Sequence, residues 1–274
     1  MRLRLPRLGL KLWVGGGLTL ALLATALLAP WLAPHSPTAQ HLFEGLERPG
    51  RAHLLGQDRL GRDILSRILH GTRISVYVGV VTVLLAAGIG TLLGALAGYF
   101  RGSLDELLMR LVDIFLAFPG ILLAIALMGV LGPSLGNVIL ALVVMGWVGY
   151  ARLVRGQVLA ARQLDYVTAA QALGARPRRV IARHLLPNVL SPVIVEATFG
   201  MAGAILAEAG LSFLGLGVQP PTPSWGSMLN EGRHYLLVAP HLTLFPGFAI
   251  MLTILGFNFL GDGLHDLLNP RQRR

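Results

Sequence analysis

Two acidic residues, Glu196 and Glu208, lie inside long apolar segments of this 274-residue chain. An ionisable group in hydrocarbon is costly, so it usually faces the interior of a helix bundle or water. In a helix, the twelve residues between them correspond to about 18 Å along the axis and about 120° around it. The two carboxylates therefore lie at different depths and on different faces. Both are candidates for lining a solute pathway, where Glu208 could meet an ammonium group. The structural alternative for Glu208 is to accept hydrogen bonds from neighbouring helices.

Few other residues have the spacing that catalysis or metal binding requires. Lys11 is the only lysine, and no Gly-Lys-Ser or Gly-Lys-Thr sequence exists, so the chain lacks the phosphate-binding loop of an ATPase. The absence of cysteine excludes a zinc ribbon and a thiol nucleophile. Four histidines of one segment lack the close spacing of metal ligands: His35, His41, His53 and His70. We therefore expect no catalytic residues, no metal site and no cofactor bound by this chain.

A compact basic segment offers a surface for a partner. It contains Arg176, Arg178, Arg179 and Arg183, placed around Val180 and Ile181. Residues 156–173 have helical propensity, and Gly174 suits the end of that helix because glycine tolerates the left-handed conformation there. Pro177 suits the first turn of a second, short helix, and Pro187 marks the entrance to the next apolar segment. The sequence thus predicts a helix, a sharp corner and a short helix.

Two interpretations of this basic segment compete. A basic loop can lie on anionic lipid headgroups without any special geometry. The corner interrupts the helix and is unnecessary for lipid contact, so docking into a soluble partner is the preferred interpretation.

The composition places these residues in a membrane protein. Hydrophobic residues make up 54% of the chain and charged residues 13%, with a mean hydropathy of +0.66, whereas a soluble domain has about a quarter charged residues. This composition excludes a soluble enzyme, a disordered chain and a nucleic-acid-binding domain, despite the net charge of +10.

A bilayer core needs roughly 20 apolar residues for each crossing. Six segments are candidates: 12–33, 74–100, 112–131, 138–154, 189–217 and 242–261. We predict an all-α membrane protein with six transmembrane helices.

The distribution of basic residues predicts the orientation. The first apolar segment is too long for a cleaved signal peptide, so we expect a retained anchor helix. Six crossings put both termini on one side, and sixteen Lys and Arg residues lie on that side against seven on the other. Short cytoplasmic loops carry the excess of Lys and Arg, so both termini and the loop 155–188 are expected in the cytoplasm. Residues 1–72 would then form the anchor helix and a periplasmic loop, and residues 73–274 a five-helix permease core.

Smaller features predict local packing. Residues 58–70 have the pattern of an amphipathic helix lying in the membrane interface. Ala86, Gly90, Gly94 and Gly98 recur every four residues, which favours close helix packing within the bundle over dimerisation. Ser224 can cap a short helix that begins at Trp225, and Trp225 is a candidate anchor at headgroup level.

The basic segment resembles the EAA motif of ABC-importer permeases. The residues that match at the family's spacing are Ala169, Ala170, Gly174, Leu186 and Pro187. Thr168 replaces the motif's Glu, and His184 replaces its Ile. Two further blocks resemble the branch of permeases for dipeptides, oligopeptides and nickel, namely 56–67 and 211–226. The resemblance covers nearly the whole chain and is closest to the second, C-type peptide permease.

This resemblance implies a type I ABC-importer permease that forms half of a translocation pathway. Expected partners are a second permease subunit, usually a different chain, two ATP-binding subunits that hold ATP and Mg, an extracytoplasmic substrate-binding protein and membrane lipids, with no nucleic acid. The loop would move as a rigid lever between ATPase and pathway, in the cytoplasmic membrane of a prokaryote. The residues expected to dock the ATPase are Ala169, Ala170, Gly174, Arg176, Pro177, Arg178, Arg179, Ile181, Arg183, His184, Leu186 and Pro187.

Peptides are the expected cargo, and other readings stay open. Nickel or another small solute is the alternative within the same family. A secondary transporter working alone predicts inverted repeats or broken helices near the midplane, and a membrane-embedded hydrolase requires a nucleophile with a nearby base. We detect neither pattern in the sequence.

Overall fold

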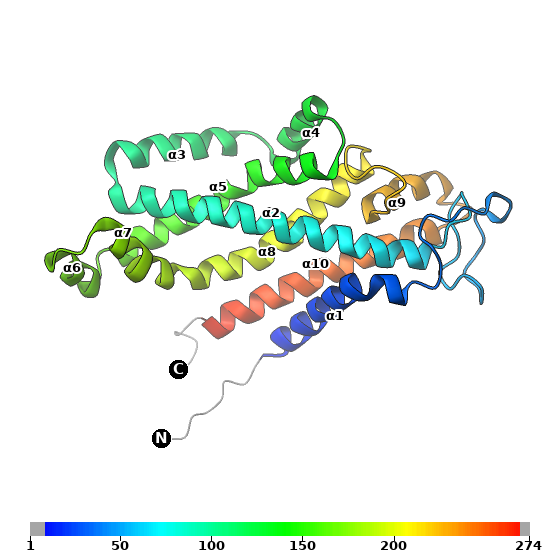
Figure 1. The fold of residues 1–274 in the computed structure, drawn as a ribbon, viewed down its shortest axis with the longest axis horizontal. Coiled ribbons are helices and arrows are strands. Elements are labelled where there is room, and N and C mark those ends of the chain that lie inside the picture. Colours follow the sequence, from blue (N-terminus) through cyan, green and yellow to red (C-terminus); the bar gives the residue numbers. More distant parts are fainter. Residues whose placement is uncertain (1–8, 269–274) are drawn as a thin grey trace, which may run out of the picture.

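The structure is a computed structural model that describes residues 9–268, and within that range the chain is almost entirely helical. The helices are α1 (Leu10–Leu32), α2 (Ile64–Phe100), α3 (Gly102–Ala117), α4 (Gly120–Leu131), α5 (Leu135–Ala161), α6 (Asp165–Ala172), α7 (Pro177–Val180), α8 (Leu186–Phe213), α9 (Trp225–Gly232) and α10 (His241–Leu268). The long helices form an elongated bundle (Figure 1). One end carries α6 and α7, and the other carries α9 and the segment between α1 and α2. We refer to them as the α6–α7 end and the α9 end.

Five stretches of helix are long and apolar enough to cross a membrane, beginning at Leu10, Ile64, Leu135, Pro177 and His241. Helices α3 and α4 make a sixth crossing if they are taken together. The predicted all-α membrane fold is therefore confirmed, with five or six candidate spans.

The third span differs from the single helix expected over 112–131. Helix α3 begins earlier, at Gly102, and meets α4 at an angle of 88°. The break lies at Phe118 and Pro119, where the backbone of Phe118 is extended, with φ −94° and ψ 135°. Proline lacks an N–H and disfavours helical backbone in the preceding residue, so Pro119 ends α3 and allows α4 to start in a new direction.

The amphipathic helix expected over 58–70 is not a separate element. Residues before Asp63 form turns, and Asp63 caps a 37-residue α2 by accepting the backbone N–H of Ser66 at 2.8 Å. The residues from Ile64 to His70 are the first two turns of that helix. The expected boundary at residues 72 and 73 consequently falls inside α2.

Helices α2 and α5 pack closely through the predicted stripe of small residues. A Cβ atom on Gly90 or Gly94 would overlap the carbonyl oxygen of Trp147 or Ala151 on α5, and one on Gly98 would lie 2.9 Å from the carbonyl oxygen of Arg155. Only glycine permits this approach of two backbones. The stripe therefore serves packing within the chain, as predicted.

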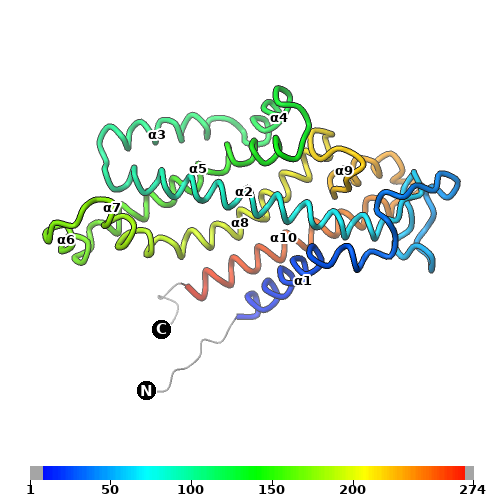
Figure 2. The backbone as a smooth tube through the Cα atoms, viewed as in Figure 1, coloured from blue at the N-terminus to red at the C-terminus, as the bar shows by residue number. Residues whose placement is uncertain are grey.

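Helices α1 and α10 lie antiparallel along one side of the bundle, and α1 begins where α10 ends, at the α6–α7 end (Figure 2). Gly15 is set against the backbone of Leu260, and Gly263 against Leu12. Lys11 forms an exposed ion pair with Asp262 at 3.2 Å.

Candidate functional site

The α6–α7 end contains the corner that the sequence predicts. Gly174 has a φ of +79°, a left-handed conformation that glycine adopts without strain. Its N–H donates to the carbonyl of Gln171 at 2.9 Å, and the N–H of Ala175 donates to that of Ala170 at 3.0 Å. These bonds satisfy carbonyls at the end of α6, and α7 then begins at Pro177. One detail differs from the expectation for 156–173: α5 ends at Ala161, and α6 is a separate helix.

The short helix α7 runs into α8 without a break. A wide, π-helical turn over Ile181–Leu185 joins the two, and every residue from Val180 to Leu186 at this junction has helical backbone angles. Pro187 lies in the first turn of α8 rather than at an interruption. Val180 and Leu185 are fully buried in the core. The backbone therefore continues from α7 into α8 with no loop between them.

Side-chain bonds hold the loop in place. Tyr166 on α6 accepts a hydrogen bond from Asn188 on α8 at 2.9 Å. Arg162 donates to the carbonyl of Tyr99, at the end of α2, at 3.0 Å. Thr168, which replaces the motif's Glu, donates to the carbonyl of Asp165 within the first turn of α6 at 2.9 Å. The Tyr166–Asn188 bond joins α6 to α8, into which α7 continues, so the three form one connected unit, and the Arg162 bond ties the segment before α6 to α2.

The expected docking residues are divided between an outward face and the core side. Exposed members are Ala169, Gly174, Arg176, Pro177, Arg178, Arg179, Arg183 and Pro187, and half-buried members are Ala170, Ile181, His184 and Leu186. Within residues 9–268, none of the four arginines forms an ion pair. Their charges are therefore available to a partner or to lipid.

Leu173 belongs to this surface and was missed by sequence reasoning. Its side chain is 88% exposed at the tip of the corner, directly before Gly174. Leu164 and Tyr166 are also exposed nearby. A leucine in a helical pattern is normally assigned to the core, and only its place beside the helix-ending glycine distinguishes it.

Glu208 is fully buried near the α9 end of α8. Its Oε1 atom accepts a hydrogen bond from the Ser212 hydroxyl at 2.6 Å, and the same hydroxyl accepts the N–H of Val218 at 3.3 Å. Glu208 thus fixes the end of α8 to the segment that leads to α9. The donor to Glu208 lies on α8 itself rather than on a neighbouring helix as expected, and the second link runs to the segment after α8.

Glu196 is in a different setting, exposed on α8 ten residues, or about 15 Å, from its first residue. It makes no hydrogen bond or ion pair with any residue that the structure describes. The two carboxylates expected at depth are therefore in different surroundings, Glu208 buried and Glu196 exposed.

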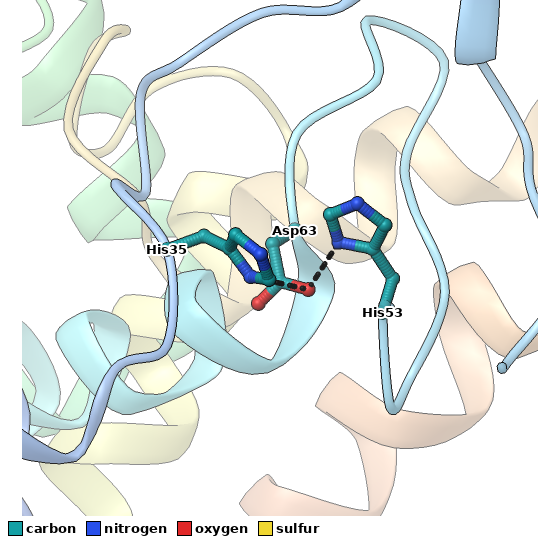
Figure 3. A group of neighbouring side chains, drawn as sticks. All are labelled: His35, His53 and Asp63. Atoms are coloured by element: carbon teal, nitrogen blue, oxygen red, sulfur yellow. Dashed lines mark hydrogen bonds and ion pairs between the residues drawn. The ribbon is translucent and has the colours of Figure 1, made fainter. Parts of the chain in front are cut away.

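Three residues that are distant in sequence meet at the α9 end: His35, His53 and Asp63 (Figure 3). One nitrogen of each histidine and one oxygen of Asp63 lie within 4.8 Å of one another. The Nδ1 atom of His53 is 2.9 Å from Asp63, and that of His35 is 3.7 Å away. Sequence spacing did not indicate this group, because turns of the segment before α2 bring its members together.

Gln57 determines what this histidine group can do. Its amide Nε2 donates to the carbonyl of Gly61 and faces Nε2 of His53, each at 3.0 Å. His53 must therefore accept at Nε2 and carry its proton at Nδ1, where it donates to Asp63. A metal at Nδ1 would displace this proton and place an N–H against the Gln57 amide. The arrangement therefore favours hydrogen bonds over a metal ion, and these bonds hold the segment after α1 against the start of α2.

A buried ionic cluster binds the same segment to α9. Asp58 pairs with Arg62 at 2.6 Å, and Arg62 also pairs with Glu231 at 2.5 Å. Arg67, only 2% exposed, lies 3.5 Å from Asp58 and 3.6 Å from Glu231. The Gly56–Arg67 block therefore has a structural function at this end of the bundle.

The short helix at residue 225 begins as expected, but its tryptophan does not anchor in the interface. Ser224 caps α9 in a reciprocal arrangement with Ser227. Trp225 is 1% exposed and donates its indole N–H to the carbonyl of Ile68 at 3.1 Å. Its indole therefore packs in the core between α9 and α2.

Comparison with known proteins agrees with this architecture. The family described as binding-protein-dependent transport system inner membrane component matches residues 90–274. The chain belongs to this family. Membership makes it a multi-pass membrane permease of an ABC importer and confirms the resemblance found in its motifs.

This chain matches two curated relatives over most of its own length and of theirs. It is 47% identical over 260 residues to the glutathione transport system permease protein GsiD of Pectobacterium atrosepticum, covering 94% of this chain and 86% of that protein. It is 46% identical over 248 residues to the dipeptide transport system permease protein DppC of Alkalihalophilus pseudofirmus, covering 90% and 82%.

A solved structure confirms the fold. An inward-facing structure of the MetNI methionine ABC transporter superposes with a TM-score of 0.59 at 19% identity, covering 73% of this chain and 94% of that chain. The type I ABC-importer permease fold is thus shared at low sequence identity.

Proposed function

We propose that this chain imports short peptides as the permease subunit of an ATP-driven complex in the cytoplasmic membrane of a prokaryote. Its relatives named for glutathione and dipeptide transport support a peptide cargo. The observation that carries the proposed mechanism is the continuous junction between α7 and α8, with exposed arginines at its outer end. This geometry suits a part that receives force from a partner.

The α6–α7 end lies in the cytoplasm in this proposal. Four arginines without ion pairs in the described chain gather on this end, and an excess of basic residues is typical of cytoplasmic loops. The α9 end, where the charged residues of the ionic cluster pair with one another, then faces the extracytoplasmic substrate-binding protein. A second, related permease completes the pathway.

An ATPase subunit docks on the surface formed by Leu173 and the four arginines. Leu173 is an exposed apolar side chain in a segment with four exposed arginines, and many protein interfaces combine an apolar centre with a polar rim. ATP and Mg bind to two such subunits, and this chain has no catalytic role. Eight of the twelve docking residues named from the sequence are exposed as well.

Nucleotide binding drives transport by displacing the connected unit of α6 and α7. Because α7 continues into α8, α8 moves with it and exposes the pathway to alternate sides of the membrane. ATP shifts this equilibrium only by binding one state more tightly than the other. The Tyr166–Asn188 bond keeps α6 aligned with α8 during the movement.

Substitution of Leu173→Asp tests the docking surface. We expect about tenfold less ATPase subunit to co-purify with the permease, because a charge replaces an apolar contact at the centre of the interface. Leu237→Asp is the matched control, since Leu237 is 101% exposed at the opposite end of the bundle. Normal recovery of the ATPase with Leu173→Asp would contradict the proposed surface.

A further inference from the structure

Glu196 lies away from two of the exposed apolar residues of α8, whereas a third, Leu206, is 53% exposed about 80° around the helix from it. Leu190 and Ile194 are 48% and 47% exposed. At 100° per residue, Glu196 lies about 160° around the helix from Ile194 and about 120° from Leu190. An apolar exposed face suits lipid, whereas a carboxylate at this depth requires water or a polar partner. The Glu196 face of α8 is therefore directed toward an aqueous or protein-lined space.

The surface beside Glu196 is open. Gly200 and Gly203 follow one and two turns later on the same face. A Cβ on Gly203 would meet no heavy atom within 4 Å, and one on Gly200 would overlap the hydroxyl of Tyr150. The space at Gly200 is occupied by the Tyr150 hydroxyl, whereas Gly203, two turns from the carboxylate, leaves space for a ligand.

Polar groups around Glu196 leave its negative charge without a counter-ion in the described chain. The Tyr150 hydroxyl is buried and has no hydrogen-bond partner there. Arg152 on α5 lies about 13 Å from the end of that helix, a depth similar to that of Glu196. Arg152 is engaged by Asp113 at 3.2 Å, however, so it does not neutralise Glu196.

We infer that Glu196 is a binding point for the ammonium group of the transported peptide, within the membrane-spanning part of the pathway. The inference rests on the proposed function. A free peptide amino terminus carries a positive charge and three N–H donors, and hydrogen bonds between oppositely charged groups are the strong ones. The ammonium group of a bound peptide would be the counter-ion that Glu196 lacks in the described chain, and it would be lost again when the peptide leaves.

The absence of cysteine allows a direct test of the surroundings of Glu196. Glu196→Cys introduces a single thiol into this chain, and the complete importer is reconstituted in liposomes. We expect water-soluble ammonium and sulfonate thiosulfonate reagents to label this thiol. Ile194→Cys, on the apolar face, is the matched control and should not react. An unreactive Glu196→Cys would overturn the inference.

Transport by Glu196→Gln tests the charge itself. The probes are L-alanyl-L-alanine and glutathione, and uptake is measured per ATP hydrolysed. Loss of a hydrogen bond between charged groups should reduce uptake about tenfold in Glu196→Gln, while Glu196→Asp retains most of it. Full uptake by Glu196→Gln would overturn the inference and leave peptide import intact. Failure of the unaltered importer to transport either probe would instead contradict the proposed peptide cargo.

Discussion

At Gly174 the left-handed backbone is required, while the side-chain position is empty. A Cβ there would meet no heavy atom within 4 Å, but φ is +79°. Gly174→Val should therefore cost about 1–2 kcal/mol of local strain and distort the corner without blocking the surface. We expect normal membrane insertion with reduced substrate-stimulated ATP hydrolysis in proteoliposomes.

Gly174→Asn is the control for this prediction. Asparagine enters the left-handed region more readily than valine, so it should preserve most of the stimulated hydrolysis. Equal activity of the valine and asparagine variants would show that the corner's conformation is not needed for coupling.

Individual residues differ in how well the sequence revealed them. Gly174 and Pro177 were predictable because each has a specific backbone conformation, and the structure confirms both positions. Leu173 and Trp225 were not, because an apolar side chain fits the core, a partner and lipid equally well until its neighbours are known. The His35–His53–Asp63 group depends on turns that bring distant residues together, and no local spacing encodes it.

At the scale of elements, the packing of α2 on α5 makes a sharp prediction. Gly94→Leu would drive a side chain into the backbone at Ala151. Overpacking of this kind costs about 1–3 kcal/mol, so the purified protein should aggregate at a lower temperature in detergent.

Gly88→Leu supplies the control on the same helix. Gly88 is exposed, and a Cβ there would meet no heavy atom within 4 Å. The two variants add the same apolar side chain to the same helix. Equal stability of Gly88→Leu and Gly94→Leu would contradict the close approach of α2 and α5.

Element boundaries were only partly predictable. Apolar length located the long helices because the bilayer sets their minimum size. It could not detect the bend at Pro119, since α3 and α4 together have the composition of one span. It also placed the start of a helix at residue 58 rather than 64, because the alternation of polar and apolar residues continues through the turns before Asp63.

At the scale of the whole molecule, the buried ionic cluster links the segment before α2 to α9. Glu231→Ala would remove one of the two carboxylates near Arg62 and Arg67, whose side chains are only 4% and 2% exposed. Removing one member of a buried cluster costs about 3 kcal/mol. We expect a lower unfolding temperature and faster proteolysis at the α9 end.

Asp266→Ala is the matched control for the whole-molecule prediction. Asp266 is 51% exposed and lies 3.7 Å from His265, and exposed pairs contribute about 0–1 kcal/mol. If both variants unfold at the same temperature, the cluster does not hold the two segments together.

The overall architecture was the most predictable level. Composition, span length and three motifs were sufficient for an all-α permease, and the family match and the shared fold confirm it. The packing of the segments outside the spans was not predictable. It depends on long-range pairs such as Arg62 and Glu231, which are 169 positions apart in the sequence.

The pairing of α1 with α10 has a consequence for biosynthesis. Of the described helices, α1 leaves the ribosome first and α10 last, yet Gly15 of α1 is shaped to receive the backbone at Leu260. Until α10 is made, the face of α1 at Gly15 has no Leu260 backbone to pack against. A nascent chain stopped before α10 would leave the face of α1 at Gly15 without the backbone that it packs against in the complete bundle.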